Sequence, residues 1–322
     1  YHCSFCGKHF FEEVLFLPRY SRMTSRLAAY IISNLSDVRS FTSVAREVNL
    51  SISTVIRVFD CVNYGKPKQL PKVVSIDEFK GNTDREKYQC ILTDPANHRI
   101  VDILPTRCSF QLTRYFSQLD RSQTTHFVSD MWGPYADIAK IYFKNAVYVI
   151  DKYHFIRQIF WAFEAIRKEE QKKFSKTRRI YFKRSRVLLN KRYKFLTPEQ
   201  KQQVDLMLYA SSRLLTAYSL KEQFFEVLNS KDSDSARMAL SRWIMAAQNS
   251  GLEKFINCGN TLVRWSKGIL NSFGCPYTNG FTEGVNNKIK VLKRNAYGYR
   301  NFRRFRNRIL HMFYYPIQKG AA

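Results

Sequence analysis

The sequence predicts a mixed α/β fold in which a small sheet is combined with many helices. Short runs rich in β-branched and aromatic residues occur between residues 73 and 150. Apolar residues recur with the helical period before and after that region. The chain has 322 residues, of which 45% are hydrophobic, so it can bury a core in two or three domains.

Residues 1–20 are predicted to be the remnant of a zinc ribbon. Cys3 and Cys6, followed by glycine, form the turn that supplies two zinc ligands in such ribbons. Tetrahedral zinc needs four ligands, so His9 or His2 is a candidate third, and a second cysteine pair upstream would be a more natural completion. The alternative is a finger that binds no metal. The other five cysteines are scattered singly, which indicates reduced thiols rather than a disulfide framework.

Residues 21–64 are predicted to form a helix-turn-helix DNA-binding domain. Thr24, Thr42 and Ser53 can each cap a short helix with apolar residues on its inner face. The tight turn between the last two helices suits this motif, although an ordinary helical hairpin is the alternative. The third helix is expected to place three side chains in the major groove: Ser53, Thr54 and Arg57.

The region that begins at residue 72 is β-rich. Turn signals such as Gly81-Asn82 separate the expected strands, which cover residues 73–79, 88–93, 99–104, 126–129 and 146–150. The first three suit an antiparallel meander. Helices over 109–119 and 135–143 would make the later strands parallel. This order, β-β-β-α-β-α-β, is the layout of the ribonuclease H-like fold.

An α-helical insertion is predicted over 155–273, so the ribonuclease H-like core has a first part, 72–154, and a last part, 274–322. Between residues 167 and 194 the insertion has thirteen Lys or Arg and two acids, and Arg178 and Arg179 lie within this run. Like charges in such a run repel one another unless a polyanion neutralises them, so contact with the DNA backbone is expected. A solvated helix face is the alternative.

The last part of the core carries a second basic cluster on two predicted helices, and these are also expected to line DNA. No acidic residue occurs from residue 288 onward, and the cluster includes Lys288, Lys290, Lys293, Arg294, Arg300, Arg303, Arg304, Arg306 and Arg308. The whole chain has a net charge of +27 with interspersed aromatic residues, which favours double-stranded DNA over a membrane surface as the partner. No membrane-spanning run or signal peptide is visible, so we expect a cytoplasmic, nucleoid-associated bacterial protein.

Three carboxylates stand out against this basic background. Asp77 and Asp130 each end an apolar run on a predicted strand, so both are expected to emerge at strand ends. Glu283 would come from a helix that Thr278 or Asn279 can cap. Other acids compete for the same role: Glu78, Asp94, Asp102, Asp137 and Asp151.

Converging carboxylates in a chain that binds DNA suggest phosphodiester chemistry. Two divalent ions held by such acids activate a water or a 3′-hydroxyl and stabilise the leaving oxygen. Mg²⁺ is the expected ion because it prefers carboxylate oxygens, and Mn²⁺ is its substitute. Lys290, nearly two helical turns after Glu283, faces the same way and could hold a phosphate.

Four motifs together resemble the DDE transposases of the ISL3 insertion-sequence family. They are Ser75-Ile-Asp-Glu-Phe79, Phe127-Val-Ser-Asp-Met-Trp-Gly-Pro-Tyr135, Val149-Ile-Asp-Lys-Tyr-His-Phe155 and Asn279-Gly-x-x-Glu-Gly-x-Asn-Asn-Lys-Ile-Lys290. The resemblance covers nearly the whole chain and implies that Asp77, Asp130 and Glu283 are the catalytic, Mg²⁺-binding triad. Asp151 and His154 match the third motif, as groups that support the triad or contact DNA; a packed core histidine is the alternative for His154.

The resemblance also implies an activity. Such a transposase binds the terminal inverted repeats of its element, cuts the DNA there with Mg²⁺ and joins the 3′-hydroxyls to target DNA, as a homodimer when bound to DNA. Two alternatives stay open. One is an inactivated or domesticated transposase that acts as a sequence-specific DNA-binding protein. The other is a structure-selective nuclease of the same fold.

Overall fold

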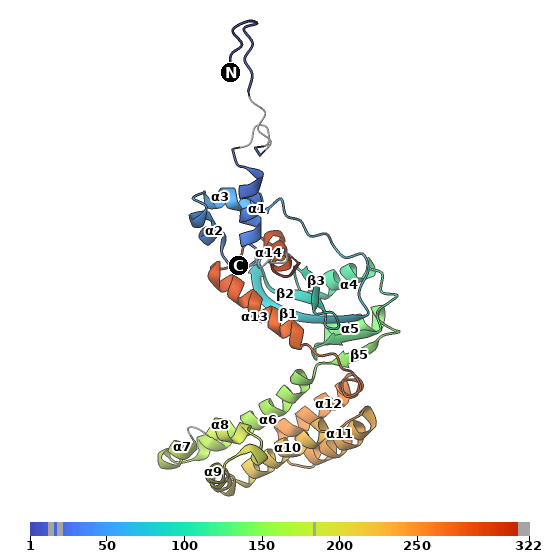
Figure 1. The fold of residues 1–322 in the computed structure, drawn as a ribbon. Coiled ribbons are helices and arrows are strands. Elements are labelled where there is room, and N and C mark those ends of the chain that lie inside the picture. The colour runs from blue at the N-terminus through green and yellow to red at the C-terminus, as the bar shows by residue number, and fades with distance from the viewer. Residues whose placement is uncertain (12–15, 18–21, 183–184, 315–322) are drawn as a thin grey trace.

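The computed structural model describes residues 1–11, 16–17, 22–182 and 185–314, without the side chains of Arg178 and Tyr181. A five-stranded sheet in the order β3-β2-β1-β4-β5 lies in the middle of the molecule (Figure 1). Its strands are β1 (Val73–Thr83), β2 (Glu86–Asp94), β3 (Arg99–Leu104), β4 (His126–Ser129) and β5 (Val147–Ile150). β1, β2 and β3 pair antiparallel, whereas β4 pairs parallel with both β1 and β5. The predicted mixed α/β class, with its meander and parallel strands, is confirmed.

The first hairpin is longer than the sequence predicted. Gly81 does not form a turn, because β1 continues to Thr83 and the chain reverses at Asp84 and Arg85. These two residues have φ values of 47° and 67°, the left-handed conformation that suits a tight hairpin. Gly81 instead leaves space for the side chain of Gln89 on β2, which would have to move if position 81 carried a Cβ.

Helices cover both faces of the sheet. α4 (Ser109–Ser117) and α5 (Gly133–Tyr142) lie where helices were predicted, and they bury Leu112, Phe116 and Tyr135 against one face. α13 (Gly280–Asn295) and α14 (Phe302–Tyr314) bury Ile289 and Phe305, together with residues of β1, β2 and β3, on the other face. The sheet is therefore a central layer, and α13 lies along β1.

The predicted helix-turn-helix region consists of α1 (Ser25–Asn34), α2 (Phe41–Glu47) and α3 (Ile52–Phe59). Thr24 caps α1 as predicted. The other two predicted caps are wrong: Ser40 caps α2 in place of Thr42, and Ser51 caps α3 in place of Ser53. Each true cap accepts the N–H of the residue three positions on, which Thr42 and Ser53 cannot do from inside the first turn.

The three N-terminal helices share their hydrophobic core with α13, α14 and the sheet. Residues from each contribute to one buried cluster that includes Ile31, Val44, Phe59, Phe79, Val285, Ile309 and Leu310. Polar contacts add to this packing, since the Arg304 guanidinium binds the Asp60 carboxylate with two hydrogen bonds of 2.8 and 2.6 Å. The helix-turn-helix region is thus built onto the sheet and the two C-terminal helices.

The prediction that the C-terminal arginines line DNA is wrong for Arg306 and Arg308. Both side chains are buried. Arg306 donates to the Asp102 carboxylate at 2.7 Å and to backbone carbonyls of the linker after α3. Arg308 donates to the carbonyls of Asp37 and Arg39, at 2.9 and 2.7 Å, between α1 and α2. Their charge therefore holds the helix-turn-helix region in place.

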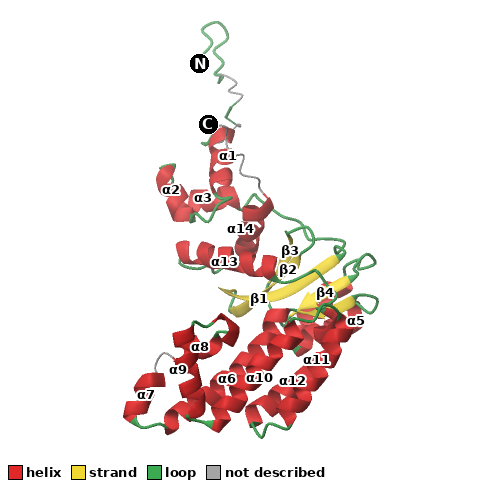
Figure 2. Cartoon of the chain, turned by 60° about the horizontal axis from the view of Figure 1, so that its bottom comes forward, coloured by secondary structure: helices red, strands yellow, loops and turns green. Residues whose placement is uncertain are grey.

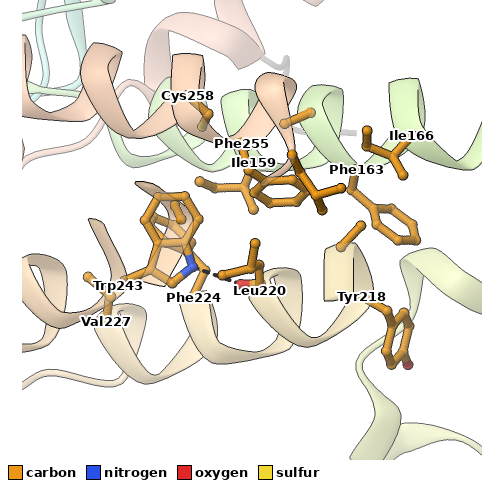
Figure 3. Packing of buried hydrophobic residues seen from close by; sticks show 14 of the residues in the cluster. Ile159, Phe163, Ile166, Tyr218, Leu220, Phe224, Val227, Trp243, Phe255 and Cys258 are labelled. Atoms are coloured by element: carbon orange, nitrogen blue, oxygen red, sulfur yellow. Dashed lines mark hydrogen bonds between the residues drawn. The ribbon is translucent and has the colours of Figure 1, made fainter. Parts of the chain in front are cut away.

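The region between β5 and α13 is helical. It comprises α6 (Lys152–Lys173), α7 (Lys176–Phe182), α8 (Ser185–Asn190), the 3₁₀ turn η1 (Tyr193–Phe195), α9 (Pro198–Tyr209), α10 (Ser212–Leu228), α11 (Ser233–Gln248) and α12 (Glu253–Asn271). Figures 1 and 2 both place these helices on the far side of the sheet from α1, α2 and α3. Their core is rich in aromatic residues: Phe224 packs edge-on against Trp243 with ring centroids 5.0 Å apart, and the Trp243 indole donates to the carbonyl of Leu220 at 2.7 Å (Figure 3).

The N-terminal Cys-x-x-Cys segment forms a tight turn, in which the N–H of Gly7 donates to the carbonyl of Cys3 at 2.9 Å. The Cys3 thiol also accepts hydrogen bonds from the Cys6 segment, and these lower its pKa. All seven cysteines are free in the structure. In the described part of the chain no group of three His, Cys, Asp or Glu is placed to hold a metal ion, so the zinc ribbon stays a prediction.

None of the described helices is long and apolar enough to cross a bilayer.

Candidate active site

Asp77 on β1 lies beside Asp130, which directly follows the neighbouring parallel strand β4. Ser75 on β1 is the register partner of Val128 on β4, and two further residues along each strand lead to Asp77 and Asp130. Asp130 follows β4 directly, as predicted. The prediction that Asp77 ends its strand is wrong, because β1 continues beyond the end of β4 and pairs there with β2 alone. The register nevertheless brings the two acids together.

The carboxyl group of Asp77 is half-buried, and several other carboxylates lie near it. Burial raises its pKa to about 6, and the charges of Glu78, Asp151 and Glu283 act in the same direction. The backbone N–H of Glu78, which donates to Asp77 Oδ1 at 2.7 Å, opposes this increase in pKa. Asn286 on α13 donates from Nδ2 to Asp77 Oδ2 at 2.8 Å. Both oxygens of Asp77 are therefore oriented by protein donors.

The carboxyl group of Asp130 has fewer hydrogen-bond partners than that of Asp77. Burial raises its pKa to about 7, and the charges of Asp77 and Glu78 add to the shift, whereas Arg157 lowers it. Its Oδ1 atom is buried, and within the described residues it has no hydrogen-bond partner. Neighbouring carboxylates with raised pKa values, one of them with an unpartnered oxygen, are an arrangement that a divalent cation would stabilise. The donor set at Asp77 and Asp130 thus fits Mg²⁺.

Glu283 lies in the first turn of α13, exposed at the edge of this pair. Asn279 occupies the predicted N-cap position, but its side chain does not cap the helix. Instead its Oδ1 accepts a hydrogen bond from Ser75 on β1, and its N–H donates to the Asp151 carboxylate at 3.1 Å. Thr282 adds a hydrogen bond of 2.7 Å to Thr93 on β2. These contacts fix the start of α13 against the sheet beside Asp77.

The three predicted acids therefore lie in one region without forming a closed metal site. The charge of Glu283 reaches Asp77 and that of Asp77 reaches Asp130. Among the residues that the structure describes, however, no three His, Cys, Asp or Glu side chains come close enough to hold a metal ion. Glu283 is the exposed acid of the three, at the start of its helix. It is therefore the acid that would have to move toward Asp77 and Asp130 to complete a metal site.

Most of the competing acids have other partners. Glu78 accepts two hydrogen bonds from Arg107, Asp94 binds Arg99, and Asp102 binds Arg306. Asp151 caps α6 by accepting from the N–H of Tyr153 at 3.2 Å, and its other oxygen accepts from Asn279. Asp151 thus ties β5, α6 and α13 together. These contacts favour Asp77, Asp130 and Glu283 over their rivals.

His154 and Trp132 are both partly buried near the pair. The Nδ1 atom of His154 accepts from the Arg157 guanidinium at 3.2 Å, and burial, with the charge of Arg157, lowers the histidine pKa. Trp132 packs edge-on against Tyr135, with ring centroids 4.7 Å apart, and under the guanidinium of Arg107. Both side chains have other partners, so neither is a candidate metal ligand.

Sequence reasoning missed two residues of the site, Asn286 and Arg157. Asn286 stands within the fourth motif, three residues after Glu283, and this helical spacing could have indicated that it reaches the same acids. Arg157 stands one turn after His154 on α6, and nothing in its local sequence distinguishes it from the surrounding cations. Both contacts depend on pairing between distant segments.

The cations of α13 divide between two faces. Lys290 and Arg294 are exposed, and Lys290 lies on the Glu283 face, where it donates to Asn287 Oδ1 at 3.2 Å. Lys288 lies over the ring of Phe313 at 4.9 Å, and Lys293 donates to the carbonyl of Lys80. Lys290 is thus the cation of α13 best placed to meet a phosphate beside the acids.

The other predicted DNA contacts lie on two separate helices. Ser53 and Arg57 are exposed on α3, where Arg57 Nη2 donates weakly to Thr54 Oγ1 at 3.5 Å. Arg179 is exposed on α7, and the side chain of Arg178 lies outside the described part of the structure. Ser53, Arg57 and Arg179 are accessible to DNA, and the roles of all the predicted contacts stay predictions.

A groove of about 490 Å³ lies between α5 and α12 and does not include the carboxylates. Ala139, Phe143 and Trp265 contribute to its apolar lining. Its exposed charged side chains are Lys140, Lys144, Arg264, Lys267 and a single acid, Asp137. The groove begins at Gly133, three residues after Asp130, so its basic rim continues away from the acidic pair.

Two family models match the chain. A model described as a transposase, of the DDE type of ISL3, matches residues 74–309, and a model described as the helix-turn-helix domain of transposase family ISL3 matches residues 12–61. The chain is 28% identical, over 93% of its length and 76% of the relative's, to the transposase for insertion sequence element IS1001 of Bordetella parapertussis. It is 25% identical, over 71% of its length and 57% of the relative's, to the transposase for IS1557 of Mycobacterium tuberculosis.

A shorter match has a different name. Over 130 residues, which cover 36% of this chain and 40% of the relative, the sequence is 33% identical to a Lactococcus lactis protein named ATP-dependent protease. This match spans too little of either chain to assign an activity. The two longer relatives and both family models are all described as transposases or as a domain of a transposase.

Proposed function

This chain belongs to the ISL3 family of DDE transposases, and from that membership we propose that it cuts DNA at the ends of an insertion sequence and joins the 3′ ends to target DNA at one active site. The observation that carries the proposal is the β1–β4 register, which sets Asp77 beside Asp130 under the start of α13. We propose that this sheet, with order β3-β2-β1-β4-β5, is a ribonuclease H-like core.

In this proposal Asp77, Asp130 and Glu283 hold Mg²⁺, as two ions, with Mn²⁺ as a substitute. Bound Mg²⁺ would supply Lewis acidity to the phosphate and lower the pKa of the attacking water or 3′-hydroxyl. The chain's own residues prepare the site: Asn286 fixes Asp77, and Asp151 holds α13 against the strand ends. Lys290 would bind the phosphate on the exposed face of α13.

The partner we propose is double-stranded DNA, bound by a homodimer. Ser53, Thr54 and Arg57 on α3 would read the terminal repeats in the major groove. Arg179, the exposed part of the basic run and the rim of the α5–α12 groove would contact the backbone. The proposed division of the chain is the zinc-ribbon remnant 1–20, the helix-turn-helix domain 21–64, the core parts 72–154 and 274–322, and the insertion 155–273.

The test uses labelled DNA from both flanks of the element that encodes the protein, supercoiled target DNA and Mg²⁺. Strand joining is expected with the wild-type chain and should be lost in Asp77→Asn, Asp130→Asn and Glu283→Gln. Asp234→Asn, an exposed acid on α11, is the matched control and should keep activity. Cleavage without joining would favour a nuclease of the same fold. Binding to the ends without cleavage would favour a DNA-binding regulator.

A further inference from the structure

Two large aromatic side chains lie exposed on α6, on either side of Arg157. Tyr153 is 54% exposed and Trp161 is 55% exposed. The Arg157 guanidinium lies 5.4 Å from the ring centroid of Tyr153 and 4.6 Å from that of Trp161. The three residues are spaced four apart, so they form one stripe along the helix, called here the α6 stripe. Its rings contact a cation on one side and solvent on the other.

The α6 stripe begins next to the acidic pair. α6 starts directly after Asp151, at the end of β5, and β5 is the neighbour of the strand that precedes Asp130. The charge of Arg157 is close enough to lower the pKa of Asp130. A DNA strand whose phosphate reaches Asp130 would therefore pass Arg157.

The guanidinium of Arg157 is not fully used in hydrogen bonds to the described residues. Its Nη2 donates to His154 Nδ1, whereas its Nε atom is buried and has no partner within the described residues. None of the ion pairs in that part of the chain includes Arg157. The side chain as a whole is only partly buried, so a phosphate oxygen at its accessible edge could form the ion pair that Arg157 lacks. A half-buried guanidinium without a carboxylate partner favours an anionic ligand on this side of α6.

We propose that Tyr153, Arg157 and Trp161 form a subsite for unpaired nucleotides of the DNA strand that is cut at Asp130. Arg157 binds a phosphodiester beside the scissile one, and the exposed faces of Tyr153 and Trp161 stack on bases. The subsite deepens the proposed function and rests on it, because the strand concerned is the transposon end. It adds residues of the helical insertion to the DNA-processing machinery.

The chemistry of the α6 stripe favours an unpaired strand over a duplex. In a duplex each base is covered by its neighbours, so an aromatic ring on a helix surface can reach only the backbone. Cations alone would suffice for that contact. Exposed rings beside a cation are the arrangement that binds single-stranded nucleic acid, because every base has a face on which a ring can stack.

The test measures equilibrium binding of the full chain in EDTA to three probes. These are an oligothymidylate of about 12 nucleotides, an abasic oligonucleotide of the same length, and a duplex of that length. Trp161→Ala is expected to weaken binding of the oligothymidylate about 10-fold and to leave the abasic and duplex probes unchanged. Tyr153→Ala should show a smaller loss of the same kind. Arg157→Ala should weaken both single-stranded probes, because it removes a phosphate contact.

Matched controls come from exposed residues of other helices. Tyr209→Ala at the end of α9 and Arg242→Ala on α11 remove the same side-chain types and should bind all three probes as the wild type does. Equal losses for Trp161→Ala on the oligothymidylate and the abasic probe would overturn the proposal, and so would no loss on any probe. Binding in EDTA requires no catalysis, so a failed joining assay with the expected binding pattern would refute the proposed function alone.

Discussion

Asn286 Nδ2 lies 2.8 Å from Asp77 Oδ2, so an amide on α13 orients a carboxylate on β1. The two residues are 209 positions apart in the sequence, on either side of the helical insertion. Asn286 itself is buried, one turn after the exposed Glu283. The helix that brings the third acid thus also fixes the first.

Replacing this amide should impair catalysis without unfolding the protein. Asn286→Ala is expected to lower the rate of DNA cleavage about 10- to 100-fold, as removal of groups that orient metal ligands does. The donor stabilises the charged form of Asp77, so its loss should raise the Asp77 pKa and move the acidic limb of the pH–rate profile to higher pH. Steady-state cleavage across pH measures both effects. Asn287→Ala, its exposed neighbour, is the control, and an unshifted profile for Asn286→Ala would contradict this role.

Removing the charge of Asp130 should stabilise the fold. Its pKa is about 7 in the folded protein against an ordinary value of 3.8, so the folded state binds the proton more tightly than the unfolded chain does. The charge therefore lowers stability progressively as pH rises from about 4 to about 7, and the full cost remains above that range. Asp130→Asn is expected to raise the free energy of unfolding by about 2 kcal/mol at pH 8 and by much less at pH 4. Urea denaturation at both pH values measures it.

The control for this comparison is Asp137→Asn, because Asp137 is exposed on α5. Its stability should follow the wild type at both pH values. A less stable Asp130→Asn protein at pH 8 would mean that the buried carboxylate is held by favourable contacts that outweigh its desolvation.

The two faces of α13 should respond differently to the loss of a lysine. Lys290→Ala is expected to reduce cleavage about 10-fold, because it removes a cation on the Glu283 face. Lys288→Ala, which removes a cation packed over Phe313, should leave the cleavage rate per folded molecule nearly unchanged. Single-turnover cleavage at saturating protein separates this effect from binding. Equal losses in the two variants would argue for a general electrostatic contribution.

The Asp60–Arg304 ion pair should contribute to stability in a pH-dependent way. The hydrogen bonds from Arg304 lower the pKa of Asp60, so the pair stabilises the fold above the ordinary value of 3.8 and the contribution is lost as pH falls below it. Arg304→Ala is expected to cost about 1 kcal/mol at pH 7 and less at pH 3. Thermal unfolding monitored by circular dichroism measures it. Arg303→Ala, exposed one residue earlier, should cost little, and a similar cost for both would exclude a specific pair.

Much of the sheet could be predicted because its strands are short apolar runs between strong turn signals. β3 and β4 have the predicted bounds, and the order of strands and helices follows from the lengths of the connections. The position of Asp77 could not be predicted in the same way. The apolar run ends near Asp77 because β1 then loses β4 as a neighbour, whereas the strand itself continues with β2. Hydrophobicity reports burial, and hydrogen bonding decides where a strand ends.

The sequence does not distinguish the roles of the arginines in the basic C-terminal helix. A run of arginines has the same appearance in the sequence whether it contacts a polyanion or the protein itself. Arg306 and Arg308 bind backbone carbonyls of segments more than 200 residues away, and a carbonyl has no signature in the sequence. The position of Asn286 next to Asp77 was invisible for the same reason, since it depends on how distant segments pair.

The shared core of α1, α2, α3, α13 and α14 has a consequence for the proposed cutting of DNA at a set position. Since α3, the proposed recognition helix, and α13, which carries Glu283, pack into one hydrophobic cluster, the path between them has a fixed length. The protein would therefore set a fixed distance between the DNA sequence bound by α3 and the phosphodiester bond cut beside α13. Base pairs inserted into the DNA between those two points would move the bond out of reach, rather than being absorbed by a hinge in the protein.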